Sequence, residues 1–110
     1  AVLAVPTANK AAYLEMTKKM AAIFKANGAL SVVDVWSDDA PEGEVTSFRK
    51  AVQATPDESI VVSWIIWPDK ATAEAGMGAA MQDTSAMPES GPPFDGKRMI
   101  FAGFEMLHQA

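Results

Sequence analysis

The feature that most constrains the fold is an almost uninterrupted apolar run from Ile60 to Trp67, in which Ser63 is the sole polar residue. A strand that is apolar on both faces belongs in the interior of a sheet, because a strand with one solvated face alternates apolar with polar positions. Pro56 precedes the run and Pro68 ends it. The sequence therefore predicts a central strand, with the other elements arranged around it.

Two segments have the three- and four-residue spacing of apolar side chains that is typical of an amphipathic helix. The first extends from about residue 9 to residue 27, with a cap at Thr7 or Asn9, a stop at Asn27-Gly28, and an apolar stripe of Tyr13, Met16, Met20, Ile23 and Phe24. The second extends from about residue 69 to residue 82. Residues 45–55 leave two interpretations open, which are one or two helical turns or an irregular crossing.

Three further segments are predicted strands, namely Ala1 to Val5, Ala29 to Trp36 and Lys97 to Leu107. The order strand, helix, strand, strand, helix, strand is the βαββαβ pattern of the ferredoxin-like fold, an α+β architecture with both helices on one face of an antiparallel sheet. We expect one such domain over residues 1–110. Because the second sheet face then has no cover, we expect a homodimer that packs sheet against sheet.

Composition excludes several classes of function. The chain contains no cysteine, which removes disulfides, thiolate zinc sites and cysteine nucleophiles. The net charge of −5 opposes nucleic-acid binding, and no apolar run approaches the roughly 20 residues of a membrane span. We expect a soluble, cytoplasmic protein that binds neither nucleic acid nor membrane. Because the first strand begins at Ala1 without a preceding methionine, we also expect a few residues before it.

Familiar catalytic patterns are incomplete. His108 is the single histidine and lies near the end of the chain, where order is often poor. The acidic residues of the 38–44 loop lack the spacing of a calcium loop, so a solvated loop is expected. Gly76-Met77-Gly78 is a fragment of a dinucleotide fingerprint inside a predicted helix, which favours close helix packing instead. We therefore expect no metal and no cofactor.

Polar and aromatic residues on the strands supply candidate site residues. Asp34 interrupts an apolar strand face beside Trp36. A carboxylate that faces a barrel interior has a raised pKa suited to proton transfer, whereas an outward one has no such role. Ser63 is either a satisfied core hydroxyl or a ligand contact. The tryptophans, Trp36, Trp64 and Trp67, are either core residues or the lining of a small apolar cleft.

The segment Phe94-Asp95-Gly96-Lys97-Arg98 opens the predicted last strand. In one interpretation it is a turn, and Phe94 anchors the loop in the core. In the other, Lys97 and Arg98 point to opposite faces of the strand, and Arg98 reaches the cleft. Its guanidinium there binds a carboxylate or enolate oxygen of a ligand, or else pairs with an internal acid such as Asp34. Only the first arrangement makes Arg98 a functional residue.

Four stretches carry a family resemblance, and the similarity covers nearly the whole chain. They are Asn27-Gly28-Ala29-Leu30, the loop from Asp38-Asp39 to Thr46-Ser47-Phe48, Val62-Ser63-Trp64-Ile65, and Met87 through Pro93-Phe94-Asp95-Gly96-Lys97-Arg98-Met99. With these stretches the chain resembles the YbaA-like family of bacterial proteins of unknown function. Mild departures occur at Arg49-Lys50 and at Ser90-Gly91-Pro92.

The resemblance implies a dimeric α+β barrel but leaves the chemistry open. One hypothesis is a cofactor-independent enzyme that acts on a small, largely apolar molecule, with Asp34 or Arg98 as the catalytic group. The alternative is a non-catalytic ligand-binding or stress-associated homodimer. Either function would use the same candidate ligand-binding residues: Trp36, Ser63, Trp64, Phe94, Asp95, Lys97 and Arg98. A cavity near or above roughly 300 Å³ on which Asp34 or Arg98 converges favours the enzyme.

Overall fold

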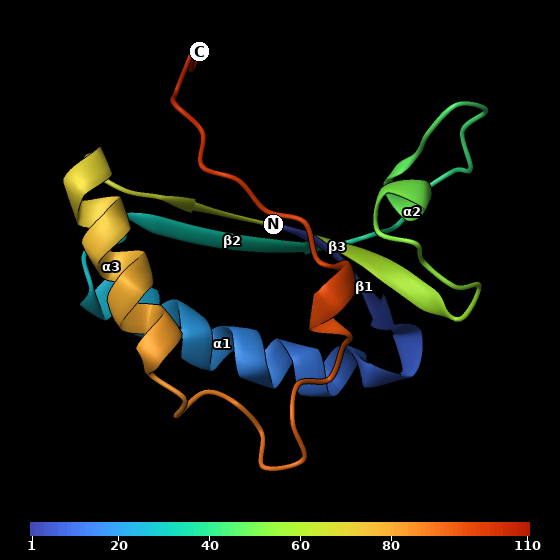
Figure 1. The fold of residues 1–110 in the computed structure, drawn as a ribbon, viewed down its shortest axis with the longest axis horizontal. Coiled ribbons are helices and arrows are strands. Elements are labelled where there is room, and N and C mark those ends of the chain that lie inside the picture. The colour runs from blue at the N-terminus through green and yellow to red at the C-terminus, as the bar shows by residue number, and fades with distance from the viewer.

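Three strands form one antiparallel sheet in the computed structural model, which describes residues 1–110 (Figure 1). The strands are β1 (Val2–Pro6), β2 (Ser31–Trp36) and β3 (Glu58–Ile66), in the order β1-β3-β2. The strand predicted from the apolar run is therefore central. β3 holds this place because apolar residues on both of its faces pack against neighbouring segments, with Val61 buried on one face and Ile60 on the other.

The helices predicted from apolar spacing are confirmed as α1 (Lys10–Ala26) and α3 (Lys70–Gln82). A short 3₁₀-helix, η1 (Thr7–Asn9), leads into α1. Neither proposed cap residue closes α1 through its side chain. The Asn9 amide donates to the Pro93 carbonyl at 2.9 Å, and the Thr7 hydroxyl pairs with the Ser59 hydroxyl at 2.7 Å. At the other end α1 stops as predicted, with Gly28 in the left-handed conformation at φ 104°.

Both long helices lie on the same face of the sheet, as the ferredoxin-like pattern predicts (Figure 1). Residues of α1 pack on Leu3 of β1 and Val61 of β3, which are register partners and so share a face. Residues of α3 pack with Phe24 of α1 and reach Ile65, two pleats along β3 on that same face. None of the helices combines the length and the apolarity needed to cross a membrane.

The opposite face of the sheet is covered only in part. Residues 45–55 contain one helical turn, α2 (Phe48–Ala51), whose cap is the Ser47 hydroxyl accepting from the Lys50 backbone N–H. The following residue, Val52, is fully buried against Ala4 and Ile60. Farther along this face nothing covers Trp64, which is 46% exposed, or its neighbour Val35 on β2.

The predicted last strand, Lys97 to Leu107, is not formed, and this segment touches the sheet at a single antiparallel bridge. Its first residues instead belong to a 3₁₀-helix, η2 (Gly96–Arg98), because the Asp95 carboxylate accepts the Lys97 backbone N–H and holds the turn. Ile100 then exchanges two backbone hydrogen bonds with Val2, at 2.8 and 2.9 Å. Beyond that bridge the chain forms neither helix nor strand and runs away from the helix layer (Figure 1).

Candidate functional site

The two candidate catalytic residues, Asp34 and Arg98, lie on opposite faces of the sheet. Asp34 is the register partner of Ser63, two residues from Val61, so it faces α1. Arg98 binds Glu58, which is two residues from Ile60 on β3 and therefore lies on the same face as Ile60, away from α1. Arg98 therefore pairs with an internal acid, as one alternative expected, but this acid is Glu58 and not Asp34. Asp34 and Arg98 belong to separate clusters.

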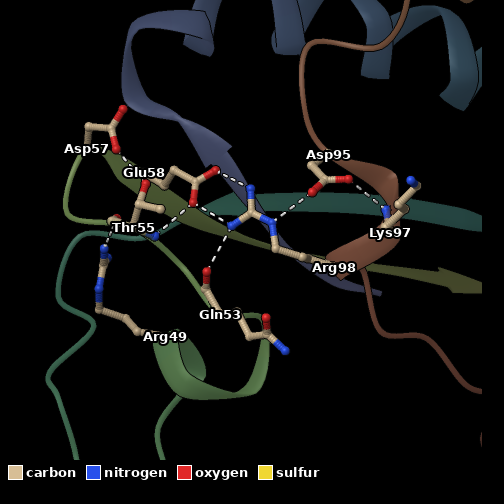
Figure 2. A network of polar contacts seen from close by, with 8 residues as sticks. All are labelled: Arg49, Gln53, Thr55, Asp57, Glu58, Asp95, Lys97 and Arg98. Atoms are coloured by element: carbon tan, nitrogen blue, oxygen red, sulfur yellow. Dashed lines mark hydrogen bonds and ion pairs between the residues drawn. The ribbon is translucent and has the colours of Figure 1, made fainter.

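The first cluster is a network of polar contacts centred on Arg98 (Figure 2). The guanidinium makes two parallel hydrogen bonds of 2.7 Å with the Glu58 carboxylate. Its Nε donates to Asp95 at 3.0 Å, and Nη1 also donates to the Gln53 carbonyl at 2.9 Å. The Glu58 carboxylate additionally accepts the Thr55 backbone N–H at 2.8 Å. This network ties η2, the start of β3 and the turn after α2 together.

The contacts of this network shift the pKa values of Glu58 and Arg98 so that both side chains stay charged at neutral pH. Hydrogen bonds from Arg98 lower the pKa of Glu58 to about 2, although burial of the carboxylate opposes this shift. The same pairing raises the pKa of Arg98 above its usual range. Arg98 and Lys97 also line a hollow of about 340 Å³ that extends from Ala51 to Ile100. The hollow reaches the expected volume, but the Arg98 guanidinium is already bonded to Glu58, Asp95 and Gln53.

The second cluster lies between α1 and the sheet, where two polar side chains lie beside three aromatic rings. The rings belong to Tyr13, Trp36 and Phe94 and are called the aromatic wall below. The Ser63 hydroxyl donates a hydrogen bond to the Asp34 carboxylate. Tyr13 of α1 lies near enough to this pair for both side chains to influence the pKa of its phenol. Its ring packs on Trp36 at 6.3 Å and on Phe94 at 5.8 Å between ring centroids. These five residues are called the Tyr13 cluster below. They come from α1, β2, β3 and the loop before η2.

The Tyr13 cluster is buried at one end and open at the other. Tyr13 is buried, Ser63 and Trp36 are half-buried, and Asp34 is exposed. Burial raises the pKa of Tyr13 to about 12, and the Asp34 charge adds to the rise while Ser63 opposes it. The phenol therefore stays protonated at neutral pH and can only donate or accept hydrogen bonds, while the exposed carboxylate is available to an incoming molecule.

Lys10, in the first turn of α1, lies over the Trp36 ring with its ammonium 5.5 Å from the centroid. This distance is within the range of a cation–π contact. A positive charge therefore stands at the open side of the aromatic wall.

The other predicted site residues have structural positions. Phe94 anchors its loop against Tyr13, as the turn interpretation expects. Asp95 caps η2, and Lys97 follows it within that helix. Trp64 is on the uncovered sheet face, away from the Tyr13 cluster. A separate, mostly apolar hollow of about 130 Å³ lies where β2 meets the following loop, and its lining includes Trp36 and Phe48.

Sequence reasoning did not identify Tyr13 or Glu58 as site residues. Tyr13 fits the apolar stripe of its helix, and Glu58 precedes the apolar run. A signal for Tyr13 was available, because a phenol on the sheet-facing side of a helix needs a polar partner and Ser63 is the sole polar residue of the central strand. No group of three or more histidine, cysteine, aspartate or glutamate side chains gathers to hold a metal ion.

Comparison with known proteins gives consistent matches. Residues 1–96 match the family described as "Protein of unknown function (DUF1428)". Two relatives, each described as "Uncharacterized protein YbaA", come from Escherichia coli (strain K12) and Shigella flexneri. Each is 48% identical over 108 residues, which cover 96% of this chain and 92% of the relative. These matches confirm the resemblance inferred from the four sequence stretches.

Proposed function

The chain belongs to the DUF1428 family of proteins of unknown function, and we propose that it is a homodimer that binds a small, largely apolar molecule at the Tyr13 cluster of each protomer. The observation that carries this proposal is the Asp34–Ser63 hydrogen bond beside the wall of Tyr13, Trp36 and Phe94. Ligand sites characteristically combine a mostly apolar lining with a few convergent polar groups.

The proposed protomer is ferredoxin-like, with the segment after η2 as its fourth strand. The Val2–Ile100 bridge supports this arrangement, because it puts that segment beside β1 in antiparallel orientation. The strand order then becomes the last strand, β1, β3 and β2, with α1 and α3 on one face.

The proposed homodimer packs the uncovered sheet faces of two protomers together as an α+β barrel. Val35 and Trp64 are both more than two-fifths exposed on that face. Because large apolar side chains on a sheet face favour burial, a self-complementary pairing about a two-fold axis would cover both copies at once. The Tyr13 cluster lies on the other side of each sheet and stays accessible in such a dimer. We propose a cytoplasmic location for the assembled protein.

A ligand screen by thermal shift tests the binding proposal. Small aromatic and alicyclic compounds that bear one polar group are expected to raise the melting temperature of the wild-type protein. Trp36→Leu and Phe94→Leu are expected to abolish that rise, because they remove the aromatic side chains that pack on Tyr13. Trp64→Leu is the matched control, since Trp64 follows Ser63 in the sequence but points to the opposite face of the sheet, away from the Tyr13 cluster. A ligand-induced rise that is lost equally in all three variants would contradict binding at the Tyr13 cluster.

A further inference from the structure

The Tyr13 cluster contains the parts of a proton-transfer site, and we infer that it moves a proton at the carbon next to a carbonyl group. The inference rests on the proposed binding function and adds a reaction to it. Asp34 is the base, Tyr13 donates a hydrogen bond to the carbonyl oxygen, and Ser63 positions the carboxylate. The substrate class is a small, flat ketone or aldehyde with an acidic C–H.

Asp34 has the geometry of a base. Its Oδ1 accepts the Ser63 hydroxyl, and its Oδ2 has no partner. The Ser63 bond joins register partners on adjacent strands, so the sheet itself fixes the direction of the carboxylate. Since Asp34 is exposed, an apolar substrate that covers it displaces water from the free oxygen. Loss of that water makes the carboxylate a better proton acceptor.

Tyr13 has the properties of an oxyanion donor. The Tyr13 side chain is largely buried beside the Asp34–Ser63 pair, but its hydroxyl oxygen keeps some exposure, and the phenol remains protonated while a negative charge is close. A fixed, uncharged donor in a site that excludes water stabilises negative charge that develops on a substrate oxygen. The rings of Trp36 and Phe94 flank the phenol and supply a flat apolar surface for the substrate.

The step balances without a co-reactant. The free Asp34 oxygen takes the proton from the carbon next to the carbonyl, and the C–H electron pair forms a carbon–carbon double bond. The carbonyl π pair moves to oxygen, which gives an enolate that accepts the Tyr13 hydrogen bond. Asp34 then returns its proton to the same carbon, or to a conjugated one, and the ketone is restored. Exchange with the solvent during this cycle labels the carbon.

Hydrogen–deuterium exchange measures this step directly. The probe is 2-tetralone, a small bicyclic ketone with an acidic benzylic C–H next to the carbonyl, incubated with the full chain in deuterated buffer and followed by NMR. Wild-type protein is expected to accelerate exchange at the carbon next to the carbonyl above the buffer rate. Asp34→Asn is expected to return the rate to that of buffer, and Tyr13→Phe to lower it about a hundredfold. Asp38→Asn, an exposed carboxylate in the loop after β2, is the matched control and keeps the wild-type rate.

A parallel thermal shift with the same ketone separates the two proposals. A melting shift in the wild type without faster exchange overturns proton transfer and leaves binding intact. Faster exchange that persists in Asp34→Asn also overturns it. If 2-tetralone and two further ketones with a benzylic C–H next to the carbonyl give neither a shift nor exchange, both proposals fail. Ser63→Ala is expected to slow exchange while the ketone still shifts the melting temperature, because Ser63 acts through Asp34; circular dichroism verifies that each variant is folded.

Discussion

Arg98 and Glu58 form a bidentate ion pair, with two N–H···O bonds of 2.7 Å that join positions 40 residues apart in the chain. The Glu58 side chain is 5% exposed and that of Arg98 is 22% exposed. A carboxylate so deeply buried is tolerated because its charge is paired and its oxygens accept hydrogen bonds. The pair therefore joins η2 to the sheet, and we interpret Arg98 as a structural residue.

Arg98→Ala is expected to lower the free energy of unfolding by about 3 kcal/mol, since it leaves the buried Glu58 charge without its partner. Urea denaturation measures the loss. Adding Glu58→Gln in the same chain should recover part of it, because no charge then remains buried. The ligand-induced melting shift should persist in Arg98→Ala, and its disappearance would assign Arg98 to the binding site instead.

Acid is expected to destabilise the protein through Glu58. The pKa of this carboxyl is lowered to about 2 in the folded state from an ordinary value of 4.5. Its contribution is therefore fully present above about pH 4.5 and is lost as the pH falls toward 2, which amounts to at most about 3 kcal/mol. Chemical denaturation between pH 6 and pH 2.5 follows this loss. Glu58→Gln should show a shallower decline, and an unchanged slope would contradict the assignment.

Gly76 and Gly78 make a matched pair for testing helix packing. A Cβ at Gly76 would overlap the Trp67 ring, whereas one at Gly78 would meet nothing within 4 Å. Gly76→Ala is expected to destabilise the fold by about 1–3 kcal/mol through overpacking. Gly78→Ala is expected to stabilise it by up to about 1 kcal/mol, because alanine has a higher helix propensity than glycine at an exposed position. Melting temperatures of the two variants should move in opposite directions.

The single tyrosine permits a direct titration of Tyr13. Phenolate absorbance at 295 nm should rise near pH 12 rather than near pH 10, since burial raises this pKa. Asp34→Asn should lower the midpoint, because the nearby negative charge is gone. The raised pKa contributes stability below about pH 10 that is lost as the pH rises through 12. Circular dichroism at each pH tests whether the protein is still folded, and a midpoint near 10 in folded protein would contradict the buried phenol.

The proposed dimer depends on the uncovered sheet face. Light scattering at micromolar concentration is expected to give twice the monomer mass, with an interface above roughly 1,000 Å². Trp64→Ser should shift the equilibrium toward monomer, because it removes the largest exposed side chain of that face. Leu14→Ser is the control, since Leu14 is similarly exposed, at 52%, but lies on α1. Equal effects of the two substitutions would argue against sheet-to-sheet packing.

Local patterns in the sequence were sufficient for the central strand, both long helices and the family. Each of these depends on residues that are close in the chain, such as the apolar run before Pro68 or the spacing from Tyr13 to Phe24. Side-chain direction in a strand or helix follows from its period, so the placement of Asp34 and Trp36 on one face was also predictable.

Pairing between distant segments was decided only by the tertiary structure. Glu58 binds Arg98, although the two residues are distant in the sequence. This pairing holds η2 as a helical turn, where the alternation of the sequence predicted a strand. Tyr13 lies near Ser63 and Asp34 because α1 packs on the face of the sheet to which both of these residues point. Periodicity gives the face on which a residue lies but not its partner on another element, since that partner is set by how the elements pack together.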